Sequence, residues 1–441
     1  MNTKQYQAKK NFINSKTIVG IDPDKGKHQA IIIDEIGNPV GTPFAFKHSF
    51  WGFHVTLWKK LNERLQDVNP ENVVFAIEIS INYWQKLCHY LHQKGFTVLM
   101  VSPLATRHER PKMGSFTKTD QKDALAVANN AHQGYFNFYK EVDPFVQAMH
   151  RLSITYDKIN KDLTRVKQRL RSQVEQLFPE FTDVVNLDTD TARYLLSRFM
   201  TPEDFRELNL FTEAIEVRKK SRNQYDLNHL KELKQTAEKT IGIELQDEAY
   251  IAERLSMNVW LSQIKALNDH LKAIREEMVG LAQQTDYFDI MTSLKGISDI
   301  SAARFIAENR QLSDFNHYKK IETFAGVNLN LSDSGRYSGY RHITHLGNRR
   351  LNSIIYKMSE ETKNYIPEVR IKFLKRQMKQ PRYRKNVVAV SSNLLKLIVA
   401  LIKDNRKYEY NPEKQKELEI VEAKYKAHKE KKKQRKYKKA K

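Results

Sequence analysis

The chain has 441 residues, 40% of them hydrophobic and 29% charged, which suits two or three globular domains and excludes a disordered chain. Its 75 Lys and Arg against 52 Asp and Glu give a net charge of +23, and this excess favours a polyanionic partner, first nucleic acid and second a membrane surface. Cys88 is the only cysteine, so an intrachain disulfide and a cysteine zinc cluster are excluded.

A membrane partner is not expected. The N-terminal stretch MNTKQYQAKKNFINSK is polar and basic, unlike a signal peptide. The longest apolar stretch, residues 387–402, is interrupted by Ser391, Ser392, Asn393 and Lys396, so a buried helix is expected there. Together with the single cysteine, these features predict a cytoplasmic, bacterial-type protein that associates with the nucleoid.

Residues 17–135 alternate between strand and helix patterns, which predicts an α/β domain. Three strands, helix, strand, helix, strand and helix is also the order of an RNase H-like (RuvC-like) sheet. The predicted strands are TIVGID, HQAIIID, VGTPFAF, NVVFAIEI and FTVLMV, and the predicted helices are 51–65, 84–94 and 120–132.

The rest of the chain is predicted to be mainly helical. Residues 144–286 form a helical, coiled-coil-like region with two apolar stripes, 159–177 and 261–281, which could pair with each other, pair with another subunit, or pack on an ordinary core. A mainly α domain is expected over 287–405, where LKGISDISAARFIAE resembles a helix-hairpin-helix. Residues 406–441 form a basic tail, whose last 18 residues, 424–441, carry 11 Lys or Arg and are expected to be largely disordered until they meet a polyanion.

Four acids in the first domain form the main chemical pattern. Asp22 ends the first strand and Glu78 lies near the end of NVVFAIEI, while Asp120 and Asp123 are three apart and share one helix face. Carboxylates brought together would repel each other without a cation, and they suit Mg²⁺ (or Mn²⁺), a hard ion that keeps positions for substrate phosphate. Each acid alone is usually a solvated cap or a charged helix face; the four in this order predict a site for metal-assisted phosphoryl transfer.

The motifs GIDPDKGKH, EISINY and KTDQKDALAVA resemble the N-terminal domain of the DEDD-type transposases of insertion-sequence family 110. MTSLKGISDISAARFIAE, FAGVN and SDSGRYSGYRHITHLGNRRLN are similar to that family's second domain. The resemblance implies a RuvC-like domain with Asp22, Glu78, Asp120 and Asp123 as the metal-binding tetrad, and a catalytic serine that maps to Ser334 rather than Ser332. It also implies a site-specific recombinase guided by a structured RNA of its own element.

This chain departs from the family pattern at three positions. Ile81 and Asn328 stand where a glycine and a proline are usual, and Ser298 replaces the second glycine of the helix-hairpin-helix segment; none of these changes removes a carboxylate or the serine.

From the residues alone, a Ser-Gly pair such as the one at Ser334 is normally a turn. Its basic surroundings favour a different interpretation, because guanidinium groups bind phosphate oxygens and would bring a phosphodiester to the hydroxyl. No adjacent residue is identified as the base that takes the serine proton. The candidate nucleic-acid-binding residues are Lys118, Arg336, Arg341, Arg349 and Arg350.

The leading hypothesis is therefore a transposase or site-specific recombinase that acts on DNA, with a guide RNA as a second partner and a homo-oligomer (dimer or tetramer) as its working form. A RuvC-like metal-dependent nuclease would keep the tetrad and need no serine. A catalytically inactive nucleic-acid-binding protein is disfavoured, because clustered carboxylates facing phosphate would weaken binding.

Overall fold

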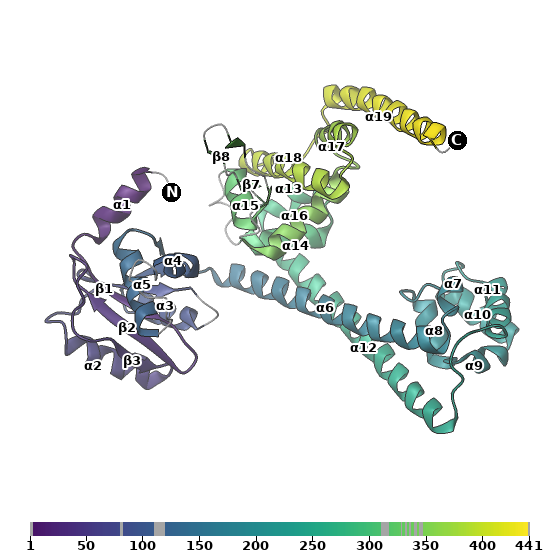
Figure 1. Ribbon diagram of the computed structural model, residues 1–441, viewed down its shortest axis with the longest axis horizontal. Helices are drawn as coiled ribbons and strands as arrows, with labels where there is room; N and C mark the ends of the chain where they lie inside the picture. Colours follow the sequence, from purple (N-terminus) through teal and green to yellow (C-terminus); the bar gives the residue numbers. More distant parts are fainter. Residues whose placement is uncertain are drawn as a thin grey trace. The chain divides into compact units, whose positions relative to one another are not determined.

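The computed structural model of the protein describes residues 3–79, 83–109, 120–309, 317–327, 329–330, 333–334, 337–338, 342–343 and 347–439. The chain divides into two compact units, Met1–Val142 and Asp143–Lys441 (Figure 1). Each unit buries its own hydrophobic clusters, two in the first and two in the second.

The first unit is built on a six-stranded mixed sheet of order β3-β2-β1-β4-β5-β6. Strand β1 pairs antiparallel with β2 and parallel with β4, and β4 pairs parallel with β5. The central strands are rich in β-branched and aromatic residues buried on both faces, as expected for strands covered by helices. The strands are β1 (Thr17–Asp22), β2 (Lys27–Ile33), β3 (Phe44–Lys47), β4 (Val73–Glu78), β5 (Thr97–Val101) and β6 (Asn137–Phe138).

Helices cover both faces of this sheet. Successive residues of β1 alternate between two buried clusters: Val19 packs with α2 and α3, whereas Ile18 packs with α1 and α5. The helix predicted over 51–65 forms as a five-residue π-helix, η1, followed by a six-residue α-helix, α2. The helices are α1 (Thr3–Ile13), η1 (Gly52–Thr56), α2 (Leu57–Asn62), α3 (Trp84–Gln93), α4 (Pro103–Glu109) and α5 (Asp120–His132).

Two long helices, α6 (Pro144–Leu177) and α12 (Asp247–Ala282), run side by side through the second unit (Figure 1). They carry the two predicted apolar stripes, so within one chain the stripes pair with each other. Five shorter helices complete a buried cluster with the end of α6 and the start of α12. These are α7 (Phe181–Val184), α8 (Asp190–Arg198), α9 (Pro202–Arg206), α10 (Leu210–Lys220) and α11 (Leu227–Ala237).

The C-terminal helices form the other buried cluster of this unit, in which α18 lies centrally. Among the described residues, α18 is the one helix whose length and composition would allow it to cross a membrane; its Val387, Leu394 and Ile398 are completely buried in this cluster. The helices are α13 (Asp286–Thr292), α14 (Asp299–Asn309), α15 (Tyr318–Ala325), α16 (Arg349–Thr362), α17 (Pro367–Lys379) and α18 (Tyr383–Lys403).

The disorder expected for the basic tail is wrong. Residues Pro412–Lys439 form one helix, α19, which packs on α17. Its first half is anchored by Leu418 and Val421, both buried in the same cluster as α18. The remainder is rich in Lys, Glu and Ala, which are strong helix formers, and a helix that is already nucleated extends at small cost.

Candidate active site

Asp22 and Glu78 lie at the same edge of the sheet. Strands β1 and β4 are parallel, with Ile21 opposite Ile77, so the two acids occupy the next position on each strand. Parallel register also places them on the same face, because side chains alternate strictly along a strand. Helix α5 covers that face of the sheet. Ile18 of β1, and the β4 residues whose side chains lie on the same face as Glu78, pack in the same buried cluster as the residues of α5.

Helix α5 lies unusually close to β1 because of Gly20. A Cβ at Gly20 would stand 2.5 Å from the carbonyl oxygen of Ala124 and 2.6 Å from the Cβ of Ala128, so only glycine permits this approach. Gly20 precedes Asp22 by two residues and Ala124 directly follows Asp123. The contact therefore holds the start of α5 beside the end of β1.

The resulting site is rich in carboxylates with little exposure. Glu78 is 8% exposed and Asp123 is 2% exposed, while Asp22 is half-buried. Asp120 is the first residue of α5, and its side chain lies outside the described part of the chain. Asp120 and Asp123 both belong to the first turn of α5, where the helix dipole favours negative charge.

The donor chemistry of this site fits a hard divalent cation, since all four predicted ligands offer carboxylate oxygen and none offers sulfur or imidazole. Among the described side chains, no three of His, Cys, Asp and Glu are close enough together to hold an ion. The structure places Asp22 and Glu78 on one face of one sheet edge and holds the start of α5, which carries Asp123, against that face.

Ser334 belongs to the second unit, in a nested pair of short antiparallel strands. In the outer pair His342 lies opposite Asn330, and in the inner pair Ser334 lies opposite Tyr337. The outer strands are β7 (Leu329–Asn330) and β10 (His342–Ile343), and the inner strands are β8 (Asp333–Ser334) and β9 (Tyr337–Ser338). Lys118, Ser332, Arg336 and Arg341 lie outside the described residues.

The base of this hairpin is fixed by two glycines. A Cβ on Gly347 would stand 2.5 Å from the backbone nitrogen of Gly326, which caps α15 in the left-handed conformation with φ of 69°. Asn348 N–H donates to the carbonyl of Phe324 at 2.8 Å. The two chain ends that enter and leave the hairpin are therefore held in contact.

A buried carboxylate, Glu308, joins this base to α6, and the sequence patterns did not indicate it. Glu308 is completely buried and accepts hydrogen bonds from Ser153 Oγ at 2.8 Å, Asn348 Nδ2 at 2.6 Å and Arg350 Nε at 2.9 Å, with His150 Nε2 at 3.6 Å. Burial alone would raise the pKa of Glu308, but the bonds from His150, Arg350, Asn348 and Ser153 outweigh it and lower the pKa to about 2.

The two predicted arginines that the structure describes have different surroundings. Arg350 Nε donates a hydrogen bond to Glu308, and Arg350 Nη2 also lies 3.2 Å from His150 Nε2. Arg349 is exposed as the first residue of α16. Of this pair, Arg349 has the exposed side chain, whereas Arg350 is hydrogen-bonded to Glu308 at the base of the hairpin.

Comparison with known proteins places these features in a family. A model for DEDD-type IS110 proteins, described as "Transposase", matches residues 19–179, and a model described as "Transposase IS116/IS110/IS902 family" matches residues 289–370. A 44.8 kDa protein of insertion element IS116 from Streptomyces clavuligerus is 23% identical over 393 residues, which is 88% of this chain and 95% of that protein. The pilin gene-inverting proteins of Moraxella bovis and Moraxella lacunata are each 30% identical over 115 residues, 26% of this chain and 34% of theirs.

Proposed function

Since the chain belongs to the IS110 family of transposases, enzymes that cleave and join DNA, we propose that it is a site-specific recombinase built from two catalytic parts. The first is the carboxylate edge of the sheet and the second is the hairpin that carries Ser334. The observation that carries this proposal is the placement of Asp22 and Glu78 on one face of the sheet edge, with the start of α5, which carries Asp123, held against that face.

The first unit is proposed to have an RNase H-like (RuvC-like) fold. Three antiparallel strands followed by two parallel strands, with α5 after them, give the order predicted for that sheet. The proposed domains are 17–135, a helical region 144–286, a C-terminal domain 287–405 and the segment 406–441. The second unit has two buried clusters: one lies wholly within 144–286, and the other joins 287–405 to Met149, Met278 and Ala282 of the helical region.

Asp22, Glu78, Asp120 and Asp123 are proposed to hold Mg²⁺ (or Mn²⁺). A bound pair of such ions stabilises the attacking and leaving oxygens of a phosphoryl transfer. The chain's own contribution is to hold the carboxylates rigidly, through the parallel register of β1 with β4 and the close contact at Gly20. The sheet and α5 also limit water around Asp123.

Ser334 is proposed as the nucleophile that joins protein to DNA. Its Oγ would form a bond to phosphorus as the bond to the leaving strand's oxygen breaks, and overall the serine proton would pass to that oxygen, which leaves as a hydroxyl. Arg349, together with Lys118, Arg336 and Arg341, is proposed to bind the strands through their phosphates. The proton acceptor for the serine is not among the residues assigned.

The partners are proposed to be DNA and a structured guide RNA, and the working form a homo-oligomer (dimer or tetramer) in the bacterial cytoplasm at the nucleoid. The net charge of +23 supports two polyanionic partners. A guide RNA would supply target selection by base pairing, so the protein itself would need few base-specific contacts.

Two variants test the proposal on a cognate DNA substrate. Asp123→Asn should lower metal-dependent cleavage by about a hundredfold or more, because a ligand to a catalytic ion contributes several kcal/mol to the transition state. Ser334→Ala should abolish strand exchange and the covalent protein–DNA adduct while sparing DNA binding. Undiminished exchange in Ser334→Ala would favour the alternative, a metal-dependent nuclease without serine chemistry, whereas wild-type cleavage by Asp123→Asn would exclude the carboxylate site.

A further inference from the structure

Two large aromatic side chains stand in solvent directly after β3. Phe50 is 65% exposed and Trp51 is 70% exposed. Side chains of this size are rarely left so open together unless they meet a partner, because each could bury a large apolar surface. Neither ring contributes to the buried clusters of the first unit.

The backbone beneath these rings is tightly built. A Cβ on Gly52 would stand 1.9 Å from the carbonyl oxygen of Lys47, so glycine alone permits the turn from β3 into the π-helix η1. Ser49 closes the turn, since its Oγ accepts from Gly52 N–H at 3.2 Å and its carbonyl accepts from Phe53 N–H at 3.0 Å. π-Helical turns are frequent at functional sites, where they aim particular side chains.

The rings are also held by neighbours. Phe50 stacks on His54, with ring centroids 4.3 Å apart and planes inclined by 16°, and lies edge-on to Trp51 at 5.7 Å. His54 in turn packs on Tyr90 of α3 at 4.6 Å. Phe50 and His54 thus form a stacked pair, and the Trp51 ring stands perpendicular to Phe50 in a fixed orientation, which lowers the entropic cost of stacking a ligand on the exposed face of Trp51.

This surface is connected to the carboxylate edge of the sheet. Strand β3 ends at the edge where β1 ends, because β2 runs antiparallel to both. His48 N–H donates to the carbonyl of Gly26 at 3.2 Å, and the rings of His28 and His48 are joined by a 2.9 Å hydrogen bond. His28 Nδ1 accepts from the N–H of Asp24 at 3.3 Å, which ties the loop after Asp22 to the same pair.

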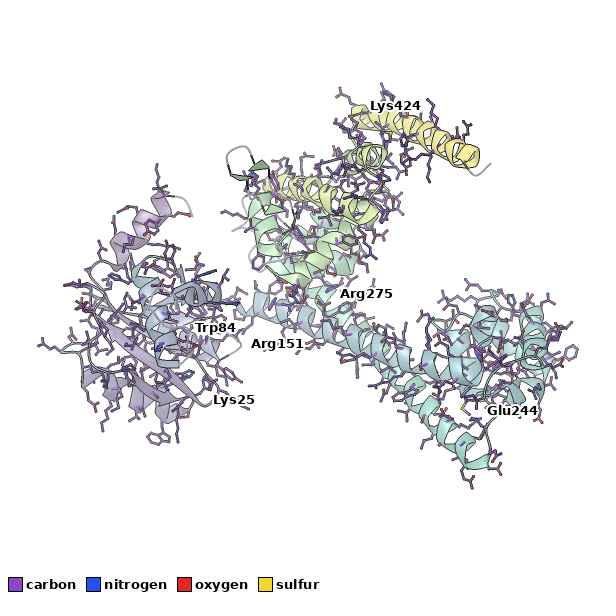
Figure 2. All side chains as sticks on the ribbon, in the orientation of Figure 1. Lys25, Trp84, Arg151, Glu244, Arg275 and Lys424 are labelled. Atoms are coloured by element: carbon purple, nitrogen blue, oxygen red, sulfur yellow. The ribbon has the colours of Figure 1, made fainter. Side chains whose placement is uncertain are left out.

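The charge of this edge suits a phosphodiester backbone. Lys27 lies opposite Lys47 in the register of β2 and β3, and both are exposed. Lys25 projects from the loop between β1 and β2 (Figure 2). Stacking surfaces flanked by lysines are the usual means by which proteins hold single-stranded nucleic acid.

We propose that Trp51, held by its edge-on contact with Phe50, forms a stacking platform for an unpaired nucleobase of the strand whose backbone crosses the Lys25–Lys27–Lys47 edge. The proposal rests on the proposed function and deepens it: the platform holds a nucleotide that flanks the reacting phosphate. Stacking needs only the face of a base, so the platform can bind a nucleotide of any sequence. This suits an enzyme whose target is selected by base pairing with a guide RNA.

The test uses the full-length protein in a buffer without divalent cations, where binding is measured and no chemistry takes place. Single-stranded DNA, single-stranded RNA and duplex DNA of one sequence are titrated against wild type, Trp51→Ala and Trp51→Phe. Phe211→Ala is the matched control, because Phe211 is 78% exposed in the second unit. Trp51→Ala should weaken binding of one of the single strands about tenfold or more, and Trp51→Phe should retain most of the affinity.

The strand that responds to Trp51 identifies the ligand as DNA or RNA. Equal affinity of wild type and Trp51→Ala for both single strands would overturn the platform, as would an equal loss in Phe211→Ala or a loss confined to duplex DNA. Asp123→Asn leaves Trp51 in place. Adding Trp51→Ala to that variant should therefore weaken single-strand binding as much as it does in wild type, even though cleavage by Asp123→Asn fails. A failure of the platform is thereby distinguished from a failure of the proposed function.

Discussion

Replacing Glu308 with Gln should destabilise the second unit by about 3 kcal/mol. The side chain is completely buried, and its pKa is lowered from 4.5 to about 2. A difference of that size corresponds to about 3 kcal/mol in favour of the carboxylate form in the folded state, at about 1.4 kcal/mol per pKa unit. Gln has nearly the same shape but no charge, so the half-buried Arg350 guanidinium would lose its completely buried anionic partner.

The sign of the pH dependence follows from the lowered pKa. The contribution of Glu308 is fully present above its ordinary pKa of 4.5 and is lost as the pH falls through about 2. The difference in unfolding free energy between wild type and Glu308→Gln should therefore be largest near neutral pH and shrink below pH 4.5. Urea unfolding followed by far-UV circular dichroism measures it, with separate transitions fitted for the two units.

Glu417→Gln provides the matched control. The pKa of Glu417 is also lowered to about 2, by hydrogen bonds from Lys375 and Lys414, but these groups lie at the surface. Water and salt screen such pairs, so the variant should unfold nearly as wild type does. A loss of less than about 1 kcal/mol in Glu308→Gln, or equal losses in both variants, would refute the argument that burial gives this network its strength.

Three further predictions concern other parts of the chain. Gly20→Ala should cost about 1–3 kcal/mol and reduce cleavage, because its Cβ would collide with the backbone of α5; Gly26→Ala, which meets nothing within 4 Å, is the control and should behave as wild type. Burial lowers the pKa of His28 to about 4, so the first unit should lose stability as the pH falls from 6.5 towards 4, and His28→Gln should flatten that slope in urea titrations. Deleting residues 424–441 should lower the log–log salt slope of DNA binding by about 0.9 for each phosphate that these residues neutralise, and an unchanged slope would show that this end of α19 is not an electrostatic anchor.

The carboxylate edge could be predicted from sequence because its signals are local. Asp22 and Glu78 each follow a run of buried apolar residues, and strand direction then places both at one edge. The i, i+3 spacing of Asp120 and Asp123 sets them on one face of a helix. Gly20 completes the arrangement, but its role depends on how closely α5 approaches, which a single sequence does not show.

Other features depended on contacts between distant segments. Glu308 lies in an apolar helix where a single acid gives no signal, and its partners come from α6 and from the start of α16. The partner of the apolar stripes could not be chosen from sequence for the same reason, and the structure shows that α6 and α12 pack together. The prediction of a disordered tail was wrong because it weighed charge density without Leu418 and Val421, the two buried residues that nucleate α19.

A buried polar network lies at the base of the hairpin that carries Ser334. The proposed nucleophile needs a rigid base, because two-residue strand pairs are weak by themselves. Here the contact of Gly326 with Gly347 joins the two chain ends, and Glu308 fixes Asn348 and α6 in one buried network. In this network Arg350 donates to Glu308, whereas the side chain of the preceding residue, Arg349, is exposed. Charge reversal at Arg349 should thus weaken DNA binding without unfolding, whereas the same change at Arg350 should unfold the second unit.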